Sequence, residues 1–289
     1  MTDVPVGGAQ AMAERRRGLM GAMVLSGLVA GVCAGAAGCS AGGAAAEDGR
    51  AADPVETLHR AADTLVAAGT SKARTSMEMA TGGTRVTIRG QGVYDYRKQR
   101  GELKVLLPQD PAGTSEHRPI TELLAPGALF MKNRGAGVPD DKWVRVETAT
   151  LSDGNLVTGG ATDPFAAAEV LRGTRTARYV GRTEVAGTAV RHYRGTADLA
   201  VAADDASAGG RDALRAAAKG FATARVPFDV YLDDEGRIRK VRHRFSFVNG
   251  QRKEAVAVAS TTLLYDFGAP VEVRLPAADD IYAGRIAED

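Results

Sequence analysis

The sequence predicts a single α+β domain in which an antiparallel β-sheet is combined with a few helices. Apolar and polar side chains alternate over several short segments between residues 85 and 267, as in half-buried strands. Turns that contain glycine separate many of these segments, as in hairpins. Helical spacing of apolar residues is confined to residues 54–68, 163–171 and 204–222.

The 289-residue chain has the composition of an ordinary globular protein, with 44% hydrophobic and 25% charged residues. Lys plus Arg (37) nearly balance Asp plus Glu (35), and the two signs are interspersed along the chain. This pattern does not favour nucleic acid as a partner. Both cysteines, Cys33 and Cys39, lie near the start, so we expect neither a disulfide framework nor a thiol metal site.

Residues 1–38 have the features of a signal peptide. Three arginines, Arg15 to Arg17, precede the uncharged stretch Leu19 to Val32, and the small residues Ala36 to Gly38 follow. The stretch is short and rich in glycine compared with a membrane span of about 20 apolar residues. A retained transmembrane anchor is the alternative, and the arginines are compatible with either general or twin-arginine export.

The sequence Ala36-Ala37-Gly38-Cys39 resembles a bacterial lipobox. The resemblance implies that the Cys39 thiol carries a diacylglyceryl group with palmitate-type chains, which anchors the protein at the extracytoplasmic face of the cell membrane. Ala36 stands where such motifs usually have Leu, so free secretion is the alternative. Residues 40–53 lack large apolar side chains and are expected to form a flexible tether, with residues 54–289 as the single folded domain.

The predicted domain consists of a few short helices and many short strands. A helix spans residues 54–68 and ends at Gly69, and Asp163 caps a short helix that Gly173 closes. On the last strand, Ala255, Ala257 and Ala259 are expected to face the interior of the sheet. The strands are expected at residues 85–96, 102–107, 120–124, 129–132, 142–147, 177–184, 190–198, 226–232, 241–247 and 254–267.

Several stretches of the chain resemble the LppX/LprAFG family of actinobacterial lipoproteins, within the wider LolA-like group of lipid carriers. The resemblance implies a strongly curved antiparallel sheet, a half-barrel, with helices across its concave face and an apolar cavity between them. Members of the group are thought to hold acyl chains in this cavity during transport. The stretches that carry the resemblance are residues 179–198, 226–233, 236–241 and 265–271, together with Lys142-Trp143-Val144.

The expected ligand is a lipid or glycolipid, held by inward-facing apolar side chains of the predicted strands. A plain packed core made of the same side chains is the alternative. No cofactor is expected, and the sequence names no protein partner. The candidate cavity residues are Val86, Ile88, Leu103, Val105, Phe228, Val230, Phe245 and Phe247.

No catalytic or metal-binding motif accompanies these segments. The histidines, His59, His117, His192 and His243, lack the spacing of metal ligands, and no nucleophile elbow or phosphate-binding loop is present. We expect a protein that is not an enzyme. Two functions stay open: a lipid-binding or lipid-shuttling module, and a structural or sensory surface lipoprotein with a filled core that binds a protein or cell-wall partner.

Overall fold

The structure, a computed structural model, describes residues 53–81, 84–108, 118–135, 137–248 and 255–283. These residues belong to one compact unit, Gly49–Asp289. The predicted signal peptide, lipobox Cys39 and most of the tether lie outside the described residues. Their assignments stay predictions.

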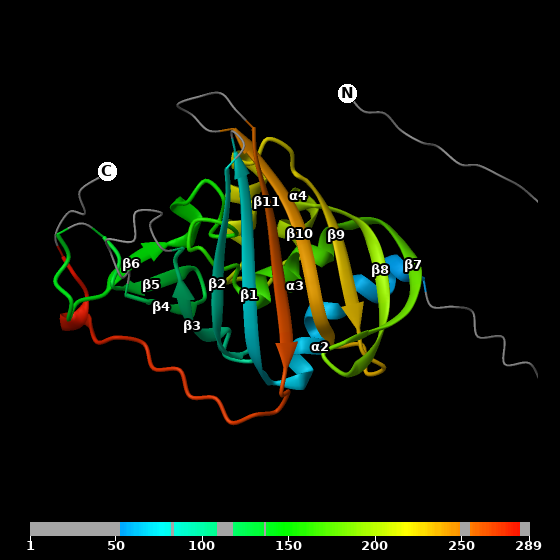
Figure 1. Ribbon diagram of the computed structural model, residues 1–289, viewed down its shortest axis with the longest axis horizontal. Coiled ribbons are helices and arrows are strands. Elements are labelled where there is room, and N and C mark those ends of the chain that lie inside the picture. The colour runs from blue at the N-terminus through cyan, green and yellow to red at the C-terminus, as the bar shows by residue number, and fades with distance from the viewer. Residues whose placement is uncertain (1–52, 82–83, 109–117, 136, 249–254, 284–289) are drawn as a thin grey trace, which may run out of the picture. The chain divides into compact units, whose positions relative to one another are not determined.

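The described strands form one antiparallel sheet whose order is β6-β5-β4-β3-β2-β1-β11-β10-β9-β8-β7 (Figure 1). The first and last strands therefore pair at the centre of the sheet, and a meander extends from each of them to an edge. The strands are β1 (Thr70–Thr81), β2 (Thr84–Asp95), β3 (Arg100–Leu106), β4 (Ile120–Ala125), β5 (Ala128–Lys132), β6 (Val144–Glu147), β7 (Thr174–Val185), β8 (Thr188–Asp198), β9 (Arg225–Leu232), β10 (Ile238–Val248) and β11 (Ala255–Tyr265).

The sheet curves around a thin layer of helices, which lies behind β1, β11 and β10 in the view of Figure 1. The predicted α+β fold, a curved antiparallel half-barrel with helices across its concave face, is confirmed. The helices are α1 (Pro54–His59), α2 (Ala61–Ala68), α3 (Pro164–Glu169), α4 (Leu199–Asp205) and α5 (Arg211–Gly220), with 3-10 turns η1 (Thr148–Thr150), η2 (Val170–Gly173) and η3 (Ala278–Asp280).

The helix starts follow from local sequence. The Asp53 carboxylate accepts a hydrogen bond from the Val55 N–H (2.9 Å), and Asp163 accepts one from the Phe165 N–H (2.7 Å). In both helices proline occupies the first position, where no N–H is required. The helix predicted over residues 54–68 is interrupted at Arg60 and ends, as expected, at Gly69.

Two local predictions were wrong. The single helix expected over residues 204–222 is two helices, and the first begins directly after β8, where Asp198 accepts a hydrogen bond from the Ala200 N–H (2.9 Å). On β11, Ala257 faces solvent, and its neighbours Val256 and Val258 are buried on the concave side. The alanine run was therefore assigned to the wrong face.

The chain after β11 returns to the outer side of β4–β6 (Figure 1). Its backbone is held there at Trp143, whose N–H donates to the Asp280 carbonyl (2.8 Å) and whose carbonyl accepts from the Tyr282 N–H (2.8 Å). The Trp143 ring is half-buried in a small outer cluster with Leu123 and Phe130. This side chain belongs to the outer face and not to the concave interior.

Candidate functional site on the concave face

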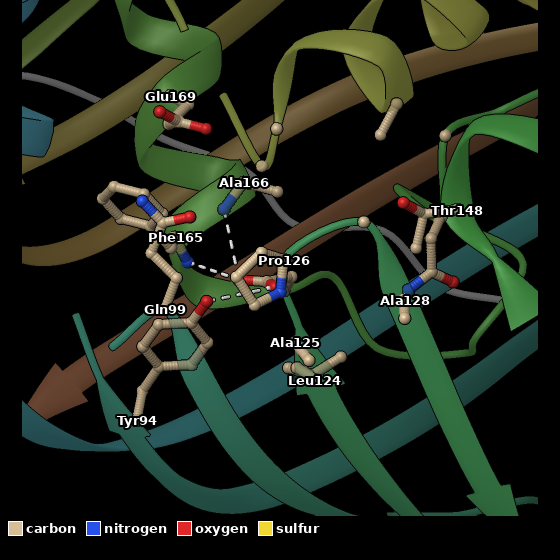
Figure 2. Close-up of a pocket in the computed structure, with 17 residues that line it drawn as sticks. Tyr94, Gln99, Leu124, Ala125, Pro126, Ala128, Thr148, Phe165, Ala166 and Glu169 are labelled. Carbon is tan, nitrogen blue, oxygen red and sulfur yellow. Dashed lines mark hydrogen bonds between the residues drawn. The ribbon is translucent and has the colours of Figure 1, made fainter. Parts of the chain in front are cut away.

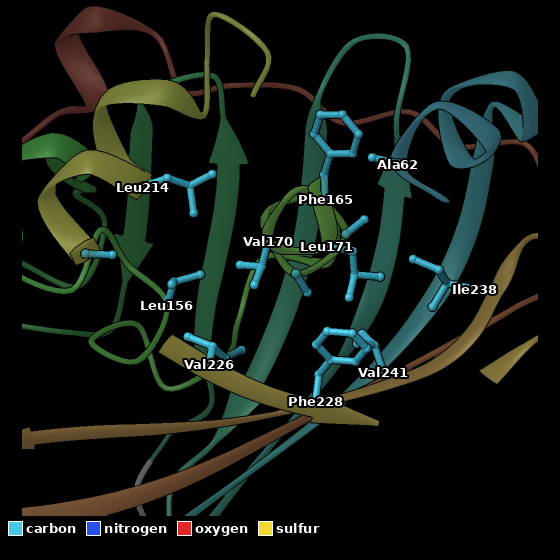
Figure 3. Close-up of a cluster of buried hydrophobic side chains, with 14 of the residues drawn as sticks. Ala62, Leu156, Phe165, Val170, Leu171, Leu214, Val226, Phe228, Ile238 and Val241 are labelled. Carbon is cyan, nitrogen blue, oxygen red and sulfur yellow. The ribbon is translucent and has the colours of Figure 1, made fainter. Parts of the chain in front are cut away.

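The predicted cavity residues pack into the main hydrophobic core between the sheet and the helices (Figure 3). Side chains from α3 and η2, including Phe165, Val170 and Leu171, cover them. Ile88, Leu103, Val105, Phe228, Val230 and Phe245 are buried, Val86 is half-buried against the same core, and the side chain of Phe247 lies outside the described part of the structure.

A polar cluster interrupts this apolar surface at the centre of the concave face. We call Thr75, Ser260, Thr262 and His243 the floor cluster; all four are buried. Thr75 of β1 lies opposite Thr262 of β11, and His243 of β10 lies opposite Ser260 of β11. The strand register therefore brings together residues that are far apart in sequence.

Most of the floor cluster lacks hydrogen-bond partners. Ser260 is satisfied, because its hydroxyl lies 2.5 Å from that of Thr162, which itself donates to the Leu156 carbonyl (2.8 Å). In contrast, Thr75 Oγ1, Thr262 Oγ1 and His243 Nε2 are buried without a partner among the described residues. A buried polar group without a hydrogen bond costs about 1–3 kcal/mol, so three neighbouring instances require a physical explanation.

His243 is enclosed by aromatic rings. Its imidazole lies 5.8 Å from the Phe245 ring and 6.5 Å from the Phe228 ring, measured between centroids. Burial lowers the pKa of the His243 imidazole from 6.5 to about 3. The ring is therefore neutral at physiological pH. One nitrogen of a neutral imidazole donates a hydrogen bond and the other accepts one, so the ring can bind an uncharged polar group of a ligand.

Glycine on β2 makes room for the Thr75 hydroxyl. A Cβ atom placed on Gly90 would lie 2.4 Å from Thr75 Oγ1 and 3.4 Å from the Ala161 Cβ. Gly90 thus leaves space in the floor, and a polar side chain of the neighbouring strand uses it.

A small pocket lined in part by carboxyl groups adjoins the helices at the β4 side of the interior (Figure 2). The Tyr94 hydroxyl donates to the Asp163 carboxylate there (3.3 Å), and burial raises the pKa of Asp163 to about 6. Glu169 accepts a hydrogen bond from the Ser207 N–H (2.7 Å), and burial raises its pKa as well. The pocket volume of ≈ 50 Å³ has room for a few water molecules and not for an acyl chain.

Glu122 of β4 is a further buried carboxyl group. Both of its oxygens lack a hydrogen-bond partner among the described residues. Burial raises the pKa of Glu122 to about 8, although the positive charge of Arg134 opposes this shift. The side chain is therefore largely protonated at neutral pH. It lies below the loop that carries Asn155 and Gly159.

The floor cluster was missed by sequence reasoning. The available signal was the alternation on β11, where Val256 and Val258 share a face with Ser260, Thr262 and Leu264. A polar residue in such a pattern is normally assigned to solvent. The other histidines do not lie near the floor cluster. His59 contacts the Thr174 carbonyl (3.0 Å), and His192 lies on the outer face beside Asp229 (2.8 Å). His117 is outside the described residues.

Among the described residues, no group of three or more His, Cys, Asp or Glu side chains is placed to hold a metal ion. No helix in this part of the chain has the length and apolar character that crossing a bilayer requires. In the turn Asp233–Glu235, Asp233 is buried and pairs with Arg237 (2.9 Å).

A curved antiparallel sheet with helices on its concave face defines the structural class, and solved structures of this class are similar to the chain. The lipoprotein LppX of Mycobacterium tuberculosis has 9% identity and a TM-score of 0.43, with 76% of this chain and 97% of that chain covered. LprF from Mycobacterium bovis has 15% identity and a TM-score of 0.40, with coverages of 78% and 97%.

A LolA superfamily protein from Nitrosomonas europaea has 10% identity and a TM-score of 0.33, with 75% of this chain and 95% of that chain covered. These proteins belong to the group that the sequence resembles. Likeness at such identities and TM-scores does not carry over a function. No protein-family model matches the chain, and no curated protein matches it significantly in sequence.

Proposed function

We propose that the protein is an extracytoplasmic lipoprotein that binds or shuttles a lipid, with the acyl chains held between the concave face of the sheet and its helices. The observation that carries this proposal is the floor cluster. Thr75, Thr262 and His243 place unpartnered polar atoms at the centre of an apolar surface. A ligand that is mostly apolar and has a few polar atoms matches such a surface.

An ester group supplies the missing hydrogen bonds. Threonine hydroxyls can donate to an ester carbonyl. The neutral His243 ring can accept a hydrogen bond from a lipid hydroxyl or donate one to an ester oxygen. The surrounding side chains, such as Phe228 and Val230, then contact the acyl chains. Because the polar atoms are satisfied only when the ligand is present, they contribute to affinity while destabilising the ligand-free fold.

The helical layer buries both large and small side chains against the sheet, the large ones including Phe165 and Leu171. Many of its buried residues are alanines, which bury little apolar area each. In this proposal the packed structure described above is the closed, ligand-free form, and the helical layer separates from the sheet to admit acyl chains. The buried alanines of the layer are Ala61, Ala62, Ala167, Ala168, Ala202, Ala203 and Ala217.

The proposed anchor is the lipidated Cys39, followed by the tether of residues 40–53, which holds the domain near the cell membrane. A diacylglyceryl group supplies two chains, and two chains suffice for stable anchoring. The anchor and the interior ligand are separate lipids in this proposal, because the first is covalent and the second exchanges.

Native mass spectrometry of the chain carrying Cys39→Ser, purified without detergent, tests the binding function. We expect a population with the added mass of a diacyl or triacyl lipid, which organic extraction removes. The variant lacks the anchoring thiol, so any lipid mass reports non-covalent binding. A ligand-free mass that persists after incubation with lipid would contradict the proposal.

A second function is favoured by the dense packing of the predicted cavity residues into one core. If the core stays filled, the protein is a structural or sensory surface lipoprotein that binds a protein or cell-wall partner through its outer face. The same mass measurement separates the two functions, because only the first requires bound lipid.

A further inference from the structure

The convex face of the sheet carries a concentration of positive charge. Arg74 of β1 lies opposite Gln91 of β2, which lies opposite Lys104 of β3. Arg89 occupies the adjacent row, opposite Ser76 on one side and Leu106 on the other. All three basic side chains are exposed, and none has an ion-pair partner among the described residues.

These cations border a groove on the convex face. The groove has a volume of ≈ 300 Å³, and Leu106, Leu263 and the three basic side chains contribute to its lining. The Arg74 guanidinium lies 5.1 Å from the centre of the Tyr265 ring, which orients it beside the groove. We call Arg74, Arg89, Lys104 and the groove between them the basic groove.

The carboxylates nearest to the basic groove do not neutralise it. Glu78 pairs with Arg242 (3.3 Å), and Asp266 pairs with Lys72 (2.9 Å). Glu102 lies two residues from Lys104 on the same face of β3 and forms no ion pair among the described residues, so it offsets one of the three positive charges and leaves a net positive charge at the basic groove.

The positive charge continues across the other half of the same face. Asp229 of β9 accepts hydrogen bonds from Arg194 (2.7 Å) and Arg244 (2.9 Å), so two arginines surround one carboxylate. Around Asp229 the arginines outnumber the carboxylate, so this half of the face also carries positive charge, while the whole chain has a formal charge of only +2. An anionic partner is complementary to this face.

Apolar side chains in the lining of the groove distinguish a lipid surface from a polar polyanion. Leu106, at the end of β3, is 50% exposed, and the half-buried Leu263 of β11 lines the same groove. A bilayer offers lipid phosphates to the cations and apolar interface to the leucines, whereas a nucleic acid or sulfated polysaccharide offers only the anions. The combination of unpaired cations with the exposed Leu106 therefore fits a membrane surface.

We propose that the convex face docks onto an anionic phospholipid bilayer, with lipid phosphates in the basic groove and Leu106 in the interface. Docking in this orientation turns the concave interior and its helices away from the bilayer. The proposal does not depend on lipid binding in the interior, because it uses other residues on the opposite face.

Co-sedimentation of the full chain carrying Cys39→Ser with vesicles tests the proposal. One set of vesicles contains phosphatidylcholine alone, and the other contains phosphatidylcholine and phosphatidylglycerol in equal parts. The difference between the two sets isolates the electrostatic contribution from any apolar contribution of the first residues of the chain. The test variant combines Arg74→Gln, Arg89→Gln and Lys104→Gln.

A matched control removes the same charge from exposed cations elsewhere, by combining Arg60→Gln, Lys98→Gln and Lys219→Gln. We expect the test variant to partition onto the anionic vesicles on the order of a hundredfold more weakly than the control, since each basic residue near such a surface contributes about a fivefold factor. Equal binding of the two variants would overturn the proposal.

Leu106→Asn separates a bilayer from a polar polyanion. We expect it to weaken binding to anionic vesicles and to leave binding to heparin unchanged. Vesicle binding that is unaffected by Leu106→Asn and that heparin displaces completely would show a polyanion site and overturn membrane docking. Lipid that co-purifies in the interior should be equal in the test and control variants, so failure of either proposal is seen separately.

Discussion

Thr75 and Thr262 lie opposite each other across the central β1–β11 pair, and neither hydroxyl has a hydrogen-bond partner among the described residues. The pair lies on the concave face, within a core that is otherwise mainly apolar. In the absence of ligand, the two unpartnered hydroxyls destabilise the fold. Replacing them therefore tests whether the site is organised for binding, because stability and lipid binding should change in opposite directions.

Replacing both threonines with valine should stabilise the ligand-free protein. Valine has nearly the shape of threonine and lacks the unpartnered hydroxyl, so we expect a gain of about 1–2 kcal/mol at each site by urea unfolding. The same double variant should bind less lipid. Thr261→Val, on the outer face of the same strand, is the matched control and should change neither property. Destabilisation by the double variant with full lipid binding would contradict the role of the hydroxyls.

Gly90→Ala should destabilise the fold through a single contact. The added Cβ would lie 2.4 Å from Thr75 Oγ1, and overpacking of this kind costs about 1–3 kcal/mol. In combination with Thr75→Ala the cost should largely disappear, because the colliding atom is removed. Urea unfolding of the two single variants and the double variant measures this coupling. Additive losses would show that the strain lies elsewhere.

Glu122→Gln should reduce the loss of stability at alkaline pH. The pKa of Glu122 is raised from 4.5 to about 8 in the fold, so its stabilising contribution is complete below pH 4.5 and is lost as pH rises through about 8. Glutamine keeps the shape without ionising. Thermal unfolding between these two pH values should therefore show a smaller decline in the variant. Parallel declines in the two proteins would mean that Glu122 is not buried as described.

His243→Phe should reduce the loss of stability at acid pH. The pKa of His243 is lowered from 6.5 to about 3, so its contribution is present above pH 6.5 and is lost as pH falls toward 3. Phenylalanine cannot be protonated and fits among aromatic neighbours. We expect the variant to lose less stability than the unmodified protein between these pH values, measured by urea unfolding. An unchanged acid profile would place the proton-binding group elsewhere.

The apolar part of the interior was predictable from the sequence. Phe228, Val230 and Phe245 alternate with polar residues, and each was correctly placed on the inward face. The caps at Asp53 and Asp163 were equally local signals, because the side chain and the N–H groups that it binds are neighbours in the chain. Alternation and capping therefore predicted most elements.

The floor cluster was not predictable in the same way. Ser260 and Thr262 are polar, so a pattern-based reading places them in solvent, and the error reversed the faces of β11. The pairing of β1 with β11 joins the two ends of the domain, and no short motif encodes this register. Buried polar residues that serve a site depart from the pattern that defines the rest of the strand.

The most direct test of lipid binding in the interior is photocrosslinking with a lipid that carries a diazirine on its acyl chain. The labelled peptides are identified by mass spectrometry. We expect label on the concave side of β1, β10 and β11, in peptides that contain Thr75, His243 and Thr262, and a loss of label after competition with unmodified lipid. Label confined to the outer face around Leu106 and Leu263, or no label, would contradict binding in the concave interior.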